Sequence, residues 1–242
     1  MKLDFFLISF IALTGYLAIF VPISGYYEIK KLKKSLELGA ANKVKFFKEI
    51  ILWSWLPIIL IALLLLLTDM NLGDIGIKWI DISSSSLNTG IVYSLIGLSL
   101  LYFGYNIYLI ILLRTNEKIR KKTAATVPKN AQVFLPITKQ EKKVWRFVAL
   151  SFGTTEEIVY RGYFFYALAF VFPELSIFYI LLIVTLLFGL GHIYQGKEVI
   201  KPTILGLFFG IFYIVFDSIL PLIILHIVGD LVATDILEEE NE

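Results

Sequence analysis

Long apolar runs separated by short polar segments dominate the hydrophobic pattern of this chain. Most of the runs approach the roughly 20 residues that a helix needs to cross the hydrocarbon core of a bilayer. Backbone groups inside a bilayer must be satisfied within the chain, so the runs are predicted to be helical. We therefore predict an all-α fold, a polytopic transmembrane helical bundle. Its seven predicted spans cover about residues 5–23, 50–68, 91–113, 147–172, 175–194, 203–216 and 222–237.

The polar segments between the spans could contain further helices. An eighth span is predicted if the first or the third loop hides a re-entrant helix. The first loop, residues 24–49, carries seven lysines with heptad-like apolar spacing. That spacing indicates a short interfacial helix on the cytoplasmic side, lying at an anionic membrane surface, or alternatively a solvated charged loop.

Basic residues lie almost entirely in three loops. Residues 24–49, 114–146 and 195–202 hold 19 of the 22 lysines and arginines. Because Lys and Arg are retained on the cytoplasmic side of short loops, these three loops are predicted to face the cytoplasm. This places the N-terminus outside and the C-terminus in the cytoplasm. Residues 69–90, with three aspartates and one lysine, then form an external loop.

The composition is that of a membrane protein and excludes several chemistries. Hydrophobic residues make up 58% and charged residues 17% of the 242 positions, and the mean hydropathy is +0.80. The chain has no cysteine, which excludes thiol catalysis, disulfides and thiolate metal sites. The net charge is only +2, and no nucleic-acid partner is predicted.

Three charged residues interrupt the fourth apolar run. Its helix is predicted to begin at the capping box formed by Thr138 and Glu141. Within it, Glu157 and Arg161 are four residues apart and can pair on one face. Glu156 lies about 100° around the helix from Glu157 and can face a different neighbour. Charge inside a membrane costs about 2.5–3.5 kcal/mol per residue, so we expect these residues to serve a purpose.

Both histidines of the chain also lie in apolar spans. His226 and Asp230 are four residues apart, so the carboxylate can orient the imidazole or hydrogen-bond a substrate. A rise of about 1.5 Å per residue places His226 at a depth similar to that of Glu156, and His192 nearer the cytoplasm. Either the helix of His192 extends past Tyr194, or the site is a funnel open to the cytoplasm. The shared location predicts one site.

The residue types narrow the chemistry of an intramembrane hydrolase. The Gly-x-Ser-Gly context of a rhomboid-type serine enzyme is absent, as is the zinc pattern His-Glu-x-x-His. An aspartyl pair at Asp217 and Asp230 would need a glycine at 227, where isoleucine stands. A carboxylate base with two imidazoles remains. Such a set can activate water and stabilise an oxyanion without a covalent intermediate.

Three motifs carry a family resemblance. They are Glu156-Glu157-x-x-x-Arg161, Phe188-x-x-x-His192 and His226-x-x-x-Asp230. This ordered set resembles the CPBP family, the CAAX protease and bacteriocin-processing group that includes the type II CAAX prenyl endopeptidases. The resemblance covers about residues 128–237. Each motif is weak alone, whereas the ordered set uses both histidines of the chain.

The resemblance implies an intramembrane endopeptidase that cleaves near the cytoplasmic side of the membrane. Glu156 would be the general base, and His192 would hold the water or shuttle its proton. His226 and residue 230 would stabilise the oxyanion. The predicted catalytic residues are thus Glu156, His192, His226 and Asp230, and the predicted site-shaping residues are Glu157, Arg161 and Phe188.

Position 230 departs from the prenyl endopeptidases, which have asparagine there. An ionised Asp230 has no proton to donate to an oxyanion, so either burial keeps it protonated or it orients His226 instead. We predict the second. No metal cofactor is favoured. The alternative is a three-ligand zinc site made of Glu156, His192 and His226.

We predict three regions: N-terminal membrane helices and basic loops in residues 1–127, a protease core in 128–237 and an acidic cytoplasmic tail in 238–242. The expected partners are the bilayer and a membrane-associated peptide or protein substrate. The Lys- and Ile-rich, cysteine-free sequence indicates a prokaryotic plasma membrane, which favours peptide or bacteriocin processing or self-immunity over CAAX cleavage. The alternatives are a catalytically silent immunity or scaffold protein and a proton-coupled transporter.

Overall fold

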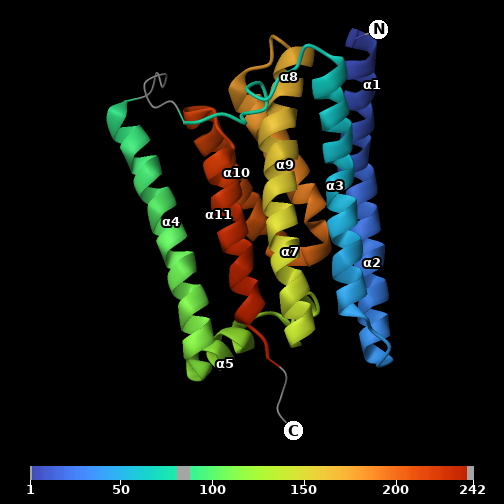
Figure 1. Cartoon of the computed structure of the whole chain (residues 1–242), viewed down its shortest axis with the longest axis vertical. Coiled ribbons are helices and arrows are strands. Elements are labelled where there is room, and N and C mark those ends of the chain that lie inside the picture. Colours follow the sequence, from blue (N-terminus) through green and yellow to red (C-terminus); the bar gives the residue numbers. More distant parts are fainter. Residues whose placement is uncertain (1, 81–87, 239–242) are drawn as a thin grey trace. The chain divides into compact units, whose positions relative to one another are not determined.

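The computed structural model describes residues 2–80 and 88–238, and this part of the chain consists of helices and turns without a β-strand (Figure 1). The predicted all-α fold is confirmed. The elements are α1 (Lys2–Gly15), the π-helical turn η1 (Tyr16–Phe20), α2 (Val21–Glu37), α3 (Lys43–Leu67), α4 (Thr89–Thr115), α5 (Glu117–Thr126), α6 (Lys129–Gln132), α7 (Lys139–Glu156), the π-helix η3 (Glu157–Phe164), α8 (Phe165–Val171), α9 (Ile177–Gly191), the 3-10 helix η4 (Ile193–Val199), α10 (Ile200–Phe216), α11 (Leu220–Leu231) and the 3-10 helix η5 (Val232–Asp235).

Apolar helices make the chain an integral membrane protein. Among the described residues, four helical stretches are long and apolar enough to cross a membrane: Leu3–Glu37, Lys43–Leu67, Thr89–Thr115 and Ile193–Phe216. Ile177–Gly191 is a shorter apolar helix. The predicted count of seven to eight spans stays a prediction.

The basic stretch 24–49 differs from its prediction. It is neither a separate surface helix nor a loop, because α2 continues the first helical run without a break to Glu37. The run ends at Gly39, whose φ of 67° belongs to the left-handed region that glycine adopts readily. The chain then enters α3 at Lys43. The lysines thus lie at the adjoining ends of two long helices.

The described residues fall into two compact units. The first consists of residues 2–31, 55–80 and 155–222. Its helices α9 and α10 approach closely at Gly210, where a Cβ atom would lie 2.4 Å from a Leu181 methyl carbon. This is the close approach that the small residues of α10 permit.

Within the first unit, hydrogen bonds join the segment before α4, residues 76–78, to the turn between α10 and α11. The Ile219 amide donates to the Gly76 carbonyl at 2.9 Å, and the Ser218 hydroxyl donates to the Lys78 carbonyl at 2.6 Å. Lys78 also forms an ion pair with Asp217. The external loop predicted for 69–90 is therefore ordered over residues 69–80, while its serines 83–86 lie outside the described residues.

The second unit consists of residues 32–54, 88–154 and 223–238. Its helix α7 begins with the predicted capping box. The Glu141 amide donates to Thr138 Oγ1 at 3.1 Å, and Glu141 Oε2 accepts from the amides of Ile137 at 2.7 Å and Thr138 at 3.3 Å. These bonds satisfy amides that the first helical turn leaves without a partner.

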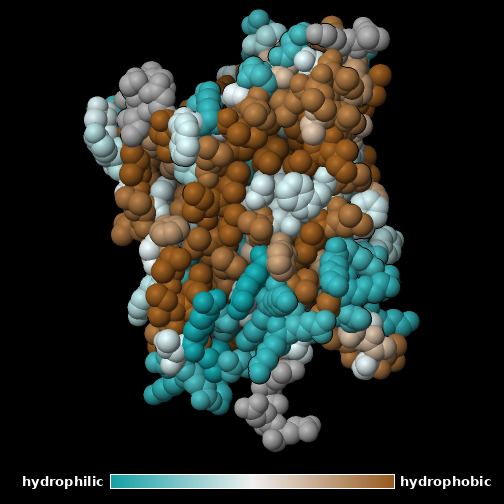
Figure 2. Space-filling view, in the orientation of Figure 1, coloured by the Kyte–Doolittle hydropathy of each residue, from teal (hydrophilic) through white to brown (hydrophobic). Residues whose placement is uncertain are grey.

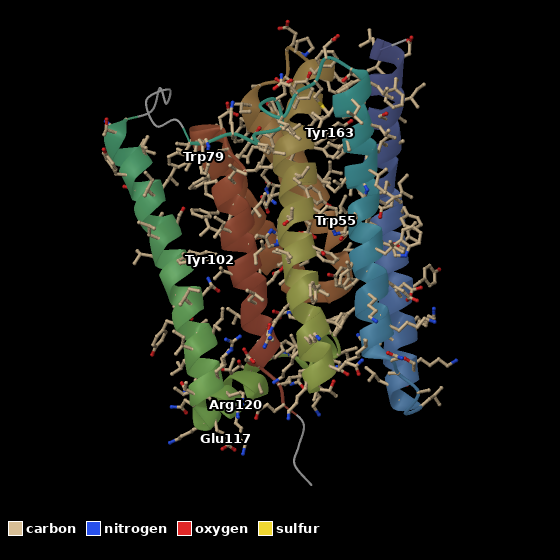
Figure 3. The ribbon with its side chains drawn as sticks, in the orientation of Figure 1. Trp55, Trp79, Tyr102, Glu117, Arg120 and Tyr163 are labelled. Carbon is tan, nitrogen blue, oxygen red and sulfur yellow. The ribbon has the colours of Figure 1, made fainter. Side chains whose placement is uncertain are left out.

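Ion pairs hold the C-terminal residues to α4 and α5 within the second unit. Arg114 Nε lies 2.6 Å from Asp235 Oδ2, and Arg120 Nη2 lies 2.6 Å from Glu238 Oε2. Arg120 and Glu117 lie on α5 (Figure 3). Hydrophilic residues gather at the end of α4 and along α5 (Figure 2). Residues 239–242 of the predicted acidic tail lie outside the described residues, and the predicted three-region division stays a prediction.

Candidate functional site

The helix that carries the paired glutamates changes its hydrogen-bond pattern at the site. The α-helical pattern of α7 ends at Glu156, and the π-helix η3 begins at Glu157. Single π-helical turns are rare and occur frequently at functional sites. The change of pattern falls between the two glutamates, Glu156 and Glu157.

Glu157 and Arg161 form the predicted ion pair. Arg161 Nη1 lies 2.9 Å from Glu157 Oε1, and their side chains are only 1% and 0% exposed. Arg161 Nη2 also donates to the Gly206 carbonyl at 3.0 Å. The guanidinium lies 4.5 Å from the ring centroid of Phe188 and 5.6 Å from that of Phe209, within cation–π range. Glu157 and Arg161 therefore tie η3 to α9 and α10.

Glu156 has a different environment from its neighbour. Its side chain is partly exposed, whereas that of Glu157 is fully buried. Arg161 Nη1 bonds the carboxylate of Glu157. A partly exposed carboxylate at this position can contact water, which a general base for hydrolysis requires.

His192 caps the C-terminal end of α9. Its Nδ1 lies 2.8 Å from the Phe188 carbonyl oxygen, and its ring packs 4.6 Å from the ring of Phe188. A carbonyl only accepts, so in the neutral ring Nδ1 carries the hydrogen and Nε2 keeps its lone pair. Because α9 ends at Gly191, its α-helix does not extend past Tyr194, and the funnel reading of the shallow His192 stays a prediction.

His226 and Asp230 share one face of α11. His226 is buried, and its Nε2 lies 3.8 Å from Asp230 Oδ2. That distance exceeds a hydrogen bond, so the carboxylate acts on the ring through charge when the imidazole is protonated. The Asp230 carbonyl accepts a hydrogen bond from Trp145 Nε1 at 3.2 Å, which fixes the end of α11 on α7.

Close packing fixes α11 on both sides within the second unit. A Cβ atom at Gly153 of α7 would lie 2.8 Å from the Ile227 amide nitrogen. A Cβ atom at Gly229 would lie 2.4 Å from the hydroxyl of Tyr102, which comes from α4 (Figure 3). Helix α11, which carries His226, therefore packs so closely at Gly153 and Gly229 that neither glycine has space for a side chain.

The structure assembles the predicted site in two parts. Its first unit holds the glutamate pair, Arg161, Phe188 and His192, and its second unit holds His226 and Asp230. The predicted Glu157–Arg161 pair is present, and the structure adds a contact of Arg161 with Phe188. The catalytic roles, and one site shared by both parts, stay predictions.

Three further residues belong to the buried surroundings of Arg161. The carbonyl of Gly206 and the ring of Phe209 contact the guanidinium, and Tyr160 packs edge-on against Phe188 with ring centroids 5.0 Å apart. The small-residue spacing at Gly206 was the available sequence signal, although it indicates packing and not a bond to Arg161. The contacts of Tyr160 and Phe209 have no comparable signal, because they depend on tertiary packing.

The described part of the chain has no group of three or more His, Asp or Glu side chains placed to hold a metal ion. The Nε2 of His192 would suit either a water molecule or zinc, because a metal-bound histidine commonly donates its other ring nitrogen to a carbonyl. The zinc alternative therefore needs a chemical test.

Comparison with known proteins gives one family match. Residues 141–232 match the family model described as type II CAAX prenyl endopeptidase Rce1-like. This segment contains all seven predicted site residues. Neither the curated proteins nor the solved structures include a match to the chain.

Proposed function

We propose that the chain, which matches the family model of the Rce1-like type II CAAX prenyl endopeptidases over residues 141–232, is an intramembrane endopeptidase in which Glu156 activates the attacking water. The family implies protease activity in general. The identity of the base and the site of cleavage are proposals about this chain.

The different surroundings of the two glutamates carry the proposal. Glu157 is fully buried and bound to Arg161, so its carboxylate is occupied in holding the helices together. Glu156 is partly exposed on the adjacent position. A general base must reach water, and of the two carboxylates Glu156 meets that condition.

His192 supports the same chemistry. With Nδ1 bonded to the Phe188 carbonyl, Nε2 is the acceptor nitrogen of the neutral ring. It would accept a hydrogen bond from the water and help to orient its lone pairs toward the peptide carbonyl. Glu156 would take the proton as the water attacks.

His226 is proposed to stabilise the oxyanion that forms in this attack. As an imidazolium or an Nε2–H tautomer it can donate a hydrogen bond to the developing charge. Asp230, whose Oδ2 lies 3.8 Å from Nε2, would orient the ring.

The substrate is proposed to be a membrane-associated peptide or protein cleaved near the cytoplasmic side. The predicted depth of His192, nearer the cytoplasm than Glu156, favours that side for the entrance to the site. Bacteriocin or peptide processing, or self-immunity, in a prokaryotic plasma membrane remains our proposal for the biological role.

Replacement of the base tests the proposal. Membrane-peptide profiles of cells carrying the wild type and Glu156→Gln are compared, with Glu174→Gln as a matched control in an exposed turn. We expect cleavage products to disappear only in Glu156→Gln, while the purified variant keeps the wild-type unfolding temperature. Persistence of the products would contradict an enzymatic role for Glu156 and would favour a silent immunity or scaffold protein.

An assay with the purified protein tests zinc. We expect cleavage by the purified protein to survive a metal chelator, because the proposed mechanism uses a carboxylate and two imidazoles. Activity that is lost on chelation and restored by zinc would instead support Glu156, His192 and His226 as metal ligands.

A further inference from the structure

A groove in the second unit lies between α4, α7 and α11. Its volume is about 490 Å³, comparable with a small-molecule pocket. Basic side chains and apolar side chains both line it. They are Arg114, Arg146, Phe147, Leu150, Ile227 and Leu231.

The two arginines make the groove attractive to an anion. Arg114 uses Nε to bond Asp235, so its two Nη groups still carry donors. Arg146 is exposed and has no ion-pair partner among residues 2–80 and 88–238. The two guanidiniums carry two positive charges, and only the Arg114 guanidinium bonds a carboxylate, which leaves positive charge and donor groups suited to phosphate.

The other four residues provide an apolar wall. Phe147 and Leu150 are three residues apart on α7 and are 56% and 51% exposed. Ile227 and Leu231 are four residues apart on α11 and so share one face. A soluble ligand would leave this wall in contact with water, whereas hydrocarbon chains would cover it.

The position of Arg114 indicates the level of the membrane surface. It lies in the last turn of α4, a helix long and apolar enough to cross a membrane. Hydrophilic residues gather at this end of α4 and on α5 (Figure 2). Basic pockets between transmembrane helices at this level bind the headgroups of anionic lipids.

We propose that this groove binds one anionic phospholipid, with the phosphate between Arg114 and Arg146 and an acyl chain along the apolar wall. Ile227 and Leu231 directly follow His226 and Asp230 in the chain, so the lipid would lie beside this candidate pair. The proposal does not depend on catalysis, and an inactive protein would bind the lipid equally well.

Native mass spectrometry of the full-length protein tests this site. The protein is released from nanodiscs of phosphatidylcholine that contain increasing fractions of phosphatidylglycerol. We expect one phosphatidylglycerol to be retained, and no phosphatidylcholine. Arg146→Gln should weaken retention about tenfold, because it removes charge-assisted hydrogen bonds to phosphate. Lys122→Gln, an exposed charge-matched control on α5, should change retention less than about twofold.

Two added ligands separate the lipid from other anions. Glycerol phosphate carries the headgroup phosphate without acyl chains, and we expect it not to displace phosphatidylglycerol. An apolar peptide with a free C-terminal carboxylate is also expected not to displace it. Displacement by either ligand, equal retention of the two lipids, or equal effects of Arg146→Gln and Lys122→Gln would overturn the proposal.

Discussion

Glu156 and Glu157 are adjacent on one helix but have different surroundings. The carboxylate of Glu157 is bound by Arg161, and both side chains are almost completely removed from solvent. A buried pair of this kind is weak evidence for stability by itself, because desolvation opposes the attraction between the charges. Removal of one partner is costly, since it leaves the other charge buried without compensation.

We therefore expect Arg161→Ala to destabilise the protein by about 3–5 kcal/mol. The variant also loses the hydrogen bond to the Gly206 carbonyl. The double variant Glu157→Gln/Arg161→Gln removes both charges and should recover part of the loss. Thermal unfolding of the purified proteins in one detergent measures the difference. Equal loss in the single and the double variant would show that the buried charge is not the cause.

Asp230 is the residue at which this chain departs from the prenyl endopeptidases. Because an ionised carboxylate cannot donate to an oxyanion, its proposed role is to orient His226, 3.8 Å away. We expect Asp230→Asn to lower the cleavage rate by about tenfold to a hundredfold, as the loss of an orienting partner does at other sites. Single-turnover kinetics with a cleaved peptide measures the rate. A faster variant would contradict this role and would identify residue 230 as an oxyanion donor.

At the scale of helices, glycine sets the distance between α9 and α10. A Cβ atom at Gly206 would lie 2.9 Å from Phe188 Cδ1 and 3.1 Å from Arg161 Nη2. The same position supplies the carbonyl that accepts from Arg161. Gly206 therefore combines close packing with a polar contact to the buried pair.

We expect Gly206→Ala to destabilise the protein by about 1–3 kcal/mol, the usual range for overpacking in a filled core. The matched control is Gly104→Ala on α4, because a Cβ atom there meets nothing within 4 Å. That substitution should be neutral or stabilising by roughly 0.5–1 kcal/mol, since alanine is the better helix former. Thermal unfolding again provides the measurement. A Gly206→Ala variant as stable as Gly104→Ala would mean that Phe188 and Arg161 can move aside.

Local sequence signals predicted some of these elements correctly. The capping box at Thr138 and the four-residue spacing of Glu157 and Arg161 both appear in the structure as bonds. Such features depend on residues within about one turn of each other, so their spacing can be read directly from the sequence.

Other features had no local signal. The π-helical register of η3 depends on packing around the helix, and the residues at 157–164 do not distinguish it from an α-helix. The continuation of the first helix to Glu37 was not predicted, because residues 24–49 were interpreted as a separate surface segment, although Lys, Leu and Glu also favour helix. The contact of Phe209 with Arg161 joins residues that are distant in sequence, and hydrophobic spacing alone does not predict it.

At the scale of the whole chain, the distribution of basic residues predicts the orientation in the membrane. The loop that contains α5 is strongly basic, whereas the loop after α3 is rich in aspartate. Helices long and apolar enough to cross a membrane, α3 and α4, lie on either side of the acidic loop, and α4 also precedes the basic loop. The positive-inside rule then places the basic loop in the cytoplasm and the acidic loop outside.

The absence of cysteine makes this orientation directly measurable. Trp79→Cys introduces a thiol into the predicted external loop, at a side chain that is 87% exposed (Figure 3). Lys122→Cys introduces one on α5, also at an exposed position. In intact cells a membrane-impermeant maleimide should label Trp79→Cys and should reach Lys122→Cys only after permeabilisation, because the bilayer excludes the charged reagent. The unsubstituted chain is the control, since it has no thiol to label. The opposite pattern would reverse the membrane orientation and with it the side from which the proposed site opens.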